Sequence, residues 1–136
     1  MRFDDIVFLE EGDLVRIHDG ALLAFGGTAG VRDQGAVAAA AARPSSGFGD
    51  QLAFDTLAKM ACSYVDSMVS SHPFSDGNKR TGYQAMVAFL AMNGFPLPED
   101  GSFPDRVLTI AEHTATTDDL VAFVASLMGG DEVVDS

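Results

Sequence analysis

One short segment of the sequence gathers most of the residue types that can do chemistry. Between Ser71 and Gly82, a histidine, an aspartate, an asparagine, a lysine and an arginine fall within nine residues. A plain turn between two helices needs only a glycine or a proline and a capping side chain, so it does not account for five such groups. We therefore infer that this segment is the functional site.

The spacing within the segment favours phosphate binding. Gly77 would begin a helix, where free backbone N–H groups and the helix dipole attract an anion. Lys79 and Arg80 add positive charge at the same place, and an arginine can bind a phosphate through two parallel hydrogen bonds. Asn78 can donate amide hydrogens to the same phosphates. The pattern predicts a phosphate cradle formed by these four residues.

Neighbouring residues would supply the reaction itself. Asp76 offers a carboxylate, and Mg²⁺ commonly binds one or two carboxylates together with the phosphate oxygens of a substrate. His72 supplies an imidazole, and histidine is the residue type most often used as a general base for a hydroxyl nucleophile. Pro73 and Phe74 would stiffen the loop by packing against the core. Together these residues predict transfer from a nucleotide phosphate to a hydroxyl.

Residues outside the segment give weaker signals. Arg32 and Asp33 are interpreted as a structural pair or a helix cap in preference to a substrate contact. His18 lies on an expected helix and is interpreted as structural, and His113 as a charge at a helix C-terminus. Cys62 is the only cysteine, so an intrachain disulfide is impossible, a zinc site is disfavoured, and a small buried hydrophobic role is expected.

The composition argues against several classes of protein. The chain has 136 residues, of which 47% are hydrophobic, enough for the core of one domain. Its 20 acidic residues against 8 basic ones argue against direct binding to nucleic acids or to anionic membranes. No apolar run reaches the length of a transmembrane helix, and the acidic N-terminus is unlike a signal peptide. The single cysteine favours a cytoplasmic location.

The charge is unevenly distributed along the chain. The formal net charge is −12, but residues 51–95 hold 3 acidic and 3 basic residues, whereas residues 96–136 hold 9 and 1. Because the chemical segment lies in the neutral part, the overall charge does not exclude a single nucleotide as a ligand. It still argues against long nucleic acids.

The elements that must position this segment are expected to be helices. Apolar residues recur at helical spacing through most of the chain, and glycines or prolines separate the periodic stretches. The fold class is therefore all-α. We expect a compact single-domain bundle over residues 1–136, with about six helices near residues 10–25, 33–42, 52–71, 78–92, 104–113 and 117–128. Residues 6–9 would form a short strand or extended arm, and residues 131–136 a frayed acidic tail.

The chemical segment resembles the signature of a known family. Residues 72–80 read His-Pro-Phe-Ser-Asp-Gly-Asn-Lys-Arg, and the general signature of the Fic/Doc (Fido) family is H-P-F-x-D/E-G-N-G-R. Lys79 stands where the general form has its second glycine, and a lysine followed by an arginine resembles the Doc ("death on curing") branch. Residues 26–35, followed by alanine-rich sequence to Arg43 and Pro44, also resemble the N-terminal half of that branch. The resemblance spans about residues 6–128.

The resemblance implies an enzyme. Fic proteins transfer AMP from ATP to a protein hydroxyl, whereas Doc is similar in fold but transfers the γ-phosphate to a threonine of elongation factor Tu and halts translation. Doc is the toxin of a toxin–antitoxin pair and is neutralised by a C-terminal segment of the antitoxin Phd. Carried over to this chain, His72 is the general base, Asp76 the Mg²⁺ ligand, and residues 77–80 the cradle for the phosphates of ATP. A Phd-like antitoxin and elongation factor Tu become the expected partners.

Two features favour phosphate transfer over AMP transfer. The Lys79 side chain would occupy space that the second glycine leaves open for the AMP-transferring pose. Tyr83 stands where many AMP-transferring members have a second arginine. AMP transfer remains the first alternative, and a catalytically idle binding module of the same fold the second. The self-inhibitory motif of some Fic proteins is absent, because Val7 precedes Glu11-Gly12 at the required spacing, so an inhibitor would have to come from another chain.

Overall fold

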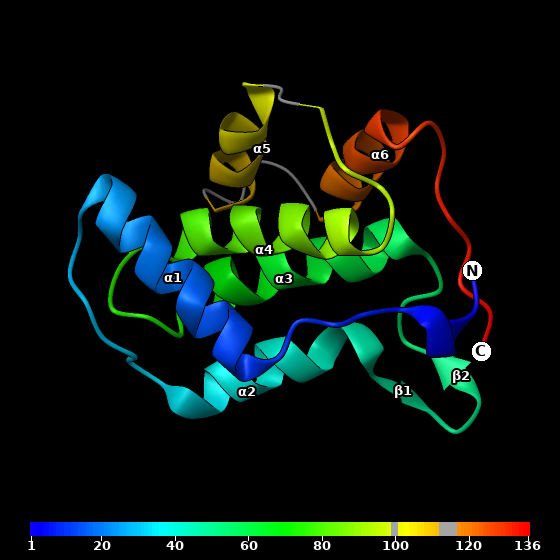
Figure 1. Cartoon of the computed structure of the whole chain (residues 1–136), viewed down its shortest axis with the longest axis horizontal. Helices are drawn as coiled ribbons and strands as arrows, with labels where there is room; N and C mark the ends of the chain where they lie inside the picture. The colour runs from blue at the N-terminus through cyan, green and yellow to red at the C-terminus, as the bar shows by residue number, and fades with distance from the viewer. Residues whose placement is uncertain (99–100, 112–116) are drawn as a thin grey trace.

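Two long helices that lie side by side form the centre of the molecule (Figure 1). The computed structural model describes residues 1–98, 101–111 and 117–136. Within them the central pair is α3 (Leu57–Ser71) and α4 (Asn78–Met92), joined by the chemical segment. The all-α fold class is confirmed, because six α-helices contain most of the described residues.

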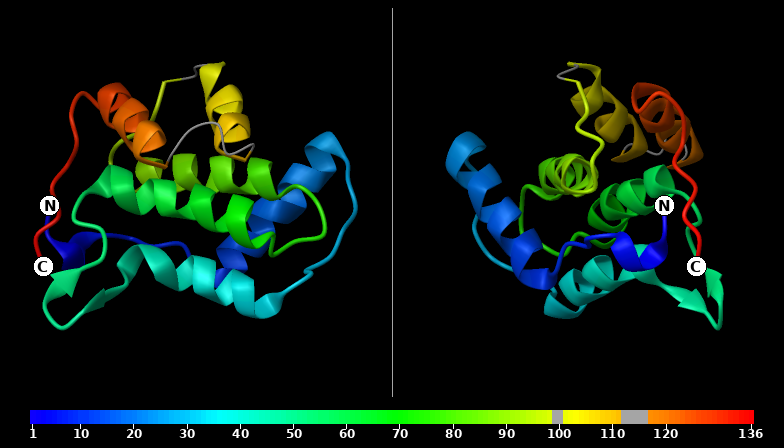
Figure 2. Two further views of the ribbon diagram at one scale, coloured as in Figure 1. Left: turned by 180° about the vertical axis from the view of Figure 1, so that it is seen from behind. Right: turned by 45° about the vertical axis from the view of Figure 1, so that its right-hand side comes forward.

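The remaining helices cover the central pair from two sides. α1 (Glu11–Phe25) and α2 (Gln34–Ala42) lie on one side, and α5 (Ser102–Ala111) and α6 (Thr117–Leu127) on the other (Figure 1 and Figure 2). The role expected for His113 at a helix C-terminus concerns a residue outside the described part of the chain. In the part of the chain that the structure describes, no helix combines the length and apolar character that a membrane crossing requires.

α3 is the core of this arrangement. Eleven of its 15 residues are buried, because apolar side chains occupy almost its whole circumference. Each fully buried large side chain stabilises the fold by roughly 1.5–3 kcal/mol. Gly82 of α4 permits the close approach of the two helices, because a Cβ at that position would lie 3.1 Å from the Cα of Val65. The loop between α3 and α4 is therefore anchored on a deeply buried helix.

The start of α3 differs from the sequence expectation. Periodicity predicts a helix from about residue 52, but Gln51–Leu52 forms β2, which pairs antiparallel with β1 (Gly47–Phe48). The helix begins after Thr56, whose side-chain oxygen accepts a hydrogen bond from the backbone N–H of Lys59 at 3.2 Å. This cap ends the extended segment and starts the helix. Two short 3-10 helices, η1 (Phe3–Asp5) and η2 (Arg43–Ser45), complete the described elements.

The two ends of the chain lie together. Residues 6–9 form an extended arm without a strand partner among the described residues. The C-terminal segment differs from the frayed tail expected over residues 131–136, since its backbone pairs with the N-terminus and with the residues just before α3. Val134 donates to the carbonyl of Asp55 at 2.9 Å, and Asp135 donates to that of Met1 at 2.9 Å. The Val134 side chain is only 4% exposed, and its burial opposes the fraying that the acidic composition suggests.

Candidate active site

The chemical segment contains a tight loop, residues 72–77, which joins α3 to the start of α4. His72 ends α3 with φ 45°, and Gly77 precedes α4 with φ 77°. A glycine adopts this left-handed conformation freely, whereas a histidine does not. Among the described residues, His72 is the single non-glycine with a positive φ. Strained backbone of this kind persists where the surrounding structure holds it, and it is concentrated at functional sites.

Arg32 holds the backbone of His72 in this conformation. Its Nε donates to the His72 carbonyl at 2.7 Å, and its Nη2 donates to the Ser71 carbonyl at 2.6 Å. These carbonyls belong to the last turn of α3, where a positive charge also complements the helix dipole. The neighbouring Asp33 caps α2 by accepting from the backbone N–H of Ala36 at 3.1 Å. The preference for structural capping at these two positions is confirmed, although they cap different helices.

Asn78 shapes the loop from its other end. Its Oδ1 accepts from the Phe74 backbone N–H at 3.0 Å, and its Nδ2 donates to the Phe74 carbonyl at 2.9 Å. The side chain is only 7% exposed. One amide hydrogen and the amide oxygen are therefore used by the loop itself. The structure gives this side chain a positioning role that the sequence did not predict, and its direct phosphate contact stays a prediction.

Phe74 fixes the middle of the loop to the core. It is 1% exposed, and its ring stacks on the ring of His18 with centroids 3.8 Å apart and planes within 7°. His18 comes from α1 and is itself 1% exposed. Pro73 is buried beside Phe74. Residues 73 and 74 thus form the buried part of the loop, and Ser75 and Asp76 belong to its exposed part.

Asp76 is exposed and lies beside the segment that follows α1. Its Oδ2 accepts from the backbone N–H of Thr28 at 3.2 Å, and its Oδ1 accepts from that of Gly77 at 2.9 Å. A Cβ at Gly27 would lie 2.8 Å from the same Oδ2. Further along, Val31 pairs with Phe74 in an antiparallel bridge. Residues 27–33 therefore form a second strip of backbone along one side of the loop.

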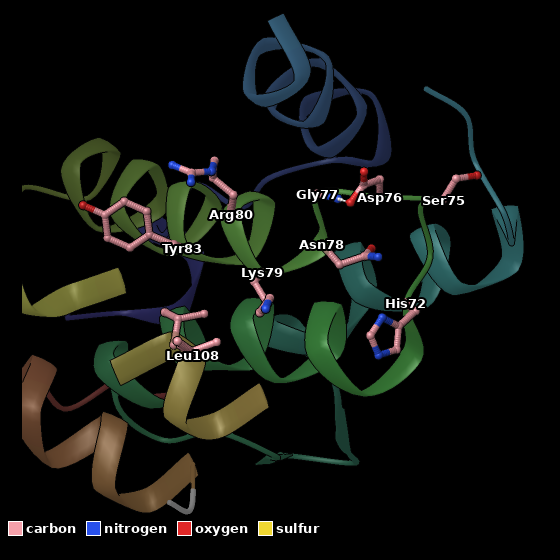
Figure 3. Close-up of a pocket in the computed structure, with 10 residues that line it drawn as sticks. His72, Ser75, Asp76, Gly77, Asn78, Lys79, Arg80, Tyr83 and Leu108 are labelled. Carbon is pink, nitrogen blue, oxygen red and sulfur yellow. Dashed lines mark hydrogen bonds between the residues drawn. The ribbon is translucent and has the colours of Figure 1, made fainter. Parts of the chain in front are cut away.

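The loop and the start of α4 border a pocket of about 470 Å³ (Figure 3). Residues predicted to take part in phosphate binding and reaction all line it: His72, Asp76, Gly77, Asn78, Lys79 and Arg80. Tyr83 of α4 and Val107 and Leu108 of α5 form its more apolar side. The pocket therefore joins a polar, positively charged end to an apolar wall, as a site for a nucleotide would require.

Lys79 and Arg80 leave α4 in different directions (Figure 3). The Arg80 side chain turns toward α1, and its guanidinium carbon lies 3.4 Å from the ring centroid of Phe25. Phe25 is 58% exposed, so this cation–π contact lies at the rim of the pocket. Both residues remain exposed to solvent, where they can meet a phosphate group.

The donor set suits Mg²⁺ only in the presence of a substrate. Among the described residues, no three His, Cys, Asp or Glu side chains lie close enough together to hold a metal ion by themselves. Asp76 offers one exposed carboxylate at the start of α4. A magnesium ion there would take its other ligands from phosphate oxygens and water, which is the usual arrangement in nucleotide sites. The residues present therefore fit the ion.

Sequence reasoning did not assign three contributors to this site. His18 lies one turn after Leu14 and one turn before Ala21, on the buried face of α1. A polar side chain on an apolar stripe is the signal that would have marked it. The pairing of residues 27–33 with the loop, and the wall supplied by α5, are contacts between distant parts of the chain that local patterns do not reveal.

Comparison with known proteins relates the chain to one family. A family described as the Fic/DOC family matches residues 8–90 of the chain, which include the whole loop. "Toxin Doc" of Mycolicibacterium smegmatis is 38% identical over 108 residues, covering 79% of this chain and 82% of that protein. "Protein kinase doc" of Escherichia phage P1 is 24% identical over 120 residues, covering 88% of this chain and 94% of that protein.

Proposed function

The chain belongs to the Fic/DOC family, and on that premise we propose that it is a Doc-like toxin that transfers the γ-phosphate of ATP to a serine or threonine hydroxyl of a target protein. The observation that carries the proposal is the pocket of about 470 Å³ at the start of α4, bordered by His72, Asp76 and Lys79 together. The names of the two relatives, a toxin and a protein kinase, support it.

The start of α4 would bind the phosphates. Its first backbone N–H groups have no partner within the helix, and the helix dipole is positive there. Lys79 and Arg80 add two charges beside these groups, and both are exposed at the pocket. The apolar wall formed by Tyr83, Val107 and Leu108 would pack against the nucleoside. Phosphoryl transfer depends chiefly on such positioning and charge stabilisation.

His72 would act as the general base. It accepts the proton of the target hydroxyl while the hydroxyl oxygen forms a bond to the γ-phosphorus and the bond from that phosphorus to the β–γ bridging oxygen breaks. ADP then leaves. Asp76 would hold Mg²⁺, which when bound neutralises charge on the phosphate oxygens. The clamp of Arg32 on the His72 carbonyl keeps the base at a fixed place relative to α4.

The proposed partners are a Phd-like antitoxin and elongation factor Tu. A toxin needs an inhibitor in the cell that makes it, and the sequence lacks the self-inhibitory motif, so the inhibitory segment would come from another chain. Co-expression with the gene beside this one should restore growth to cells arrested by the toxin. Continued arrest with every neighbouring gene would contradict the antitoxin proposal.

The decisive experiment incubates the purified protein with elongation factor Tu, Mg²⁺ and ATP labelled at either the α- or the γ-phosphate. We expect label from the γ position alone, with intact-mass spectrometry showing the gain of one phosphoryl group. Label from the α position instead would identify AMP transfer. No label from either position, on this target or in a whole lysate, would favour the idle binding module.

The matched variant for this experiment is His72→Asn. Asparagine tolerates the left-handed backbone of this position but cannot serve as the base, so the loop is kept while the proton acceptor is lost. General-base removal typically costs on the order of 10²–10⁴-fold in rate. Growth arrest by His72→Asn as strong as that of the unmodified chain would contradict the enzymatic proposal.

A further inference from the structure

His18 makes contacts that go beyond filling space in the core. Its ring stacks on Phe74 and also lies under the last residue of the loop, because a Cβ at Gly77 would be 3.7 Å from its Cδ2. Its Nε2 lies 2.8 Å from the carbonyl oxygen of Asp76. One buried ring from α1 therefore contacts Phe74 in the middle of the loop and Asp76 near its end, and lies next to Gly77.

The hydrogen bond has a defined direction. A carbonyl oxygen only accepts, so Nε2 must carry the hydrogen and donate it to Asp76. The other ring nitrogen, Nδ1, lies 3.6 Å from the carboxylate of Asp19. The donor role of Nε2 is thus the same whether the ring is neutral or charged. It holds the backbone of the residue whose side chain would bind Mg²⁺ and which directly precedes the Gly77 cap.

We propose that His18 is a positioning residue for phosphoryl transfer, which sets the place of Asp76 and of the start of α4 relative to α1. The inference rests on the proposed function for its catalytic part. The other buried residues of α1, Leu14 and Ala21, are apolar, so the core of this helix does not need a polar group. Of the two ring nitrogens of His18, Nε2 is directed at the loop.

Two substitutions separate the hydrogen bond from the packing. His18→Phe keeps an aromatic ring against Phe74 and removes the donor, whereas His18→Gln can place an amide donor near the position of Nε2. We expect His18→Phe to lower kcat about 10- to 100-fold, the usual range for residues that orient a metal-binding side chain. The KM for the target protein should change little, and His18→Gln should recover most of the lost rate.

Tyr64→Phe is the matched control. It also removes a buried hydrogen bond while keeping the ring, since the Tyr64 hydroxyl accepts from the backbone N–H of Leu9 at 3.1 Å. This bond joins α3 to the extended arm and does not touch the loop. Tyr64→Phe should keep kcat within about twofold of the unmodified chain, in the range expected for changes away from the reaction.

Amide hydrogen exchange tests the same inference without any catalysis. The amides of Ser75 and Arg32 join the loop to its neighbouring strip, donating to Gly30 at 3.0 Å and to Pro73 at 2.8 Å. His18→Phe should speed their exchange at least about tenfold, whereas Tyr64→Phe should speed that of Leu9 instead. If the unmodified protein transfers no phosphate, the proposed function fails, and these exchange rates still decide the role of His18.

Two results would overturn the inference. In one, His18→Phe matches the unmodified chain in both kcat and loop exchange. In the other, His18→Gln is no better than His18→Phe, so that the donor makes no difference. If His18→Phe does not fold, His18→Leu takes its place as the variant without a donor, and the comparison with His18→Gln is read in the same way.

Discussion

Gly27 lies where the structure leaves no room for a side chain. Its φ is 124°, and a Cβ would lie 2.8 Å from Oδ2 of Asp76. We expect Gly27→Ala to displace this carboxylate, to lower the transfer rate about tenfold or more, and to raise the Mg²⁺ concentration needed for half-maximal rate. Steady-state kinetics at varied Mg²⁺ would measure both effects.

The control for Gly27 is Gly30→Ala. Gly30 has nearly the same φ, 126°, but its Cβ would meet only the Ser75 hydroxyl at 3.4 Å. Both variants should lose roughly 1–2 kcal/mol of stability from backbone strain. A similar Mg²⁺ dependence in the two variants would show that strain, and not contact with Asp76, explains the effect.

Substitution of Lys79 tests whether its side chain sterically excludes the AMP-transferring pose of ATP. Lys79→Gly restores the general form of the Fic signature, so we expect γ-label transfer to fall about 100-fold and α-label transfer to emerge. Lys79→Met is the matched variant, because it removes the charge and keeps the bulk. It should lose γ-label transfer without gaining α-label transfer, and α-label transfer by both variants alike would contradict the steric argument.

At the scale of whole elements, α4 uses the same device at both ends. Asn78 binds the backbone of Phe74 through two hydrogen bonds of 3.0 and 2.9 Å. Asn93 binds the backbone of Val7 in the same way, through two hydrogen bonds of 2.9 Å. Asn78→Ala leaves buried backbone groups of Phe74 without partners and should cost about 2–4 kcal/mol in urea unfolding. Asn93→Ala should cost less, about 1–2 kcal/mol, because Val7 is half exposed. Only Asn78→Ala should also weaken ATP binding by calorimetry, because only that end of α4 carries the loop. Equal ATP affinities of the two variants would contradict this difference.

Two buried titratable side chains of α3 should make the fold less stable at alkaline pH. Burial raises the pKa of the Cys62 thiol well above its ordinary value, and burial likewise raises the pKa of Tyr64 to about 12. Above about pH 8.5 the unfolded thiol loses its proton while the folded one keeps it, so Cys62 contributes a loss of about 1.4 kcal/mol per pH unit. Below that pH its contribution is fully present. Urea unfolding between pH 8.5 and about 10 should show this slope. In Cys62→Ala the loss should begin only near pH 10.0, where Tyr64 of the unfolded chain starts to lose its proton.

The bounds of α4 were predictable and those of α3 only in part, for local reasons. Gly77 is a strong start signal directly before α4, and Asn93-Gly94 is a strong stop signal directly after it. α4 spans Asn78–Met92 as expected. Leu52 and Phe54 continue the apolar period of α3, so periodicity alone could not reveal that residues 47–52 turn into a hairpin. The six helices and the loop between α3 and α4 follow from the sequence. The contacts that hold the loop, from His18 and Arg32, join residues far apart in the chain and required the structure.

At the scale of the molecule, the charge pattern separates the site from the acidic surface. Residues 96–136 hold 9 of the 20 acidic residues, whereas the loop and α4 carry Lys79 and Arg80. Part of that acidic segment is used to join the chain ends, since Glu132 lies 3.2 Å from the N-terminal ammonium of Met1. An acidic chain can therefore keep a local positive field for one nucleotide at the start of α4.

The joined ends make the C-terminal segment part of the fold, and two adjacent valines test this. Val134 is 4% exposed and its backbone N–H bonds to Asp55, whereas Val133 is 59% exposed. Val134→Ala removes about two buried methyl groups and should lower the free energy of unfolding by about 1.5 kcal/mol. Val133→Ala should change it by less than about 0.5 kcal/mol. If the two variants unfold at the same urea concentration, the last residues contribute no more than a solvent-exposed tail would.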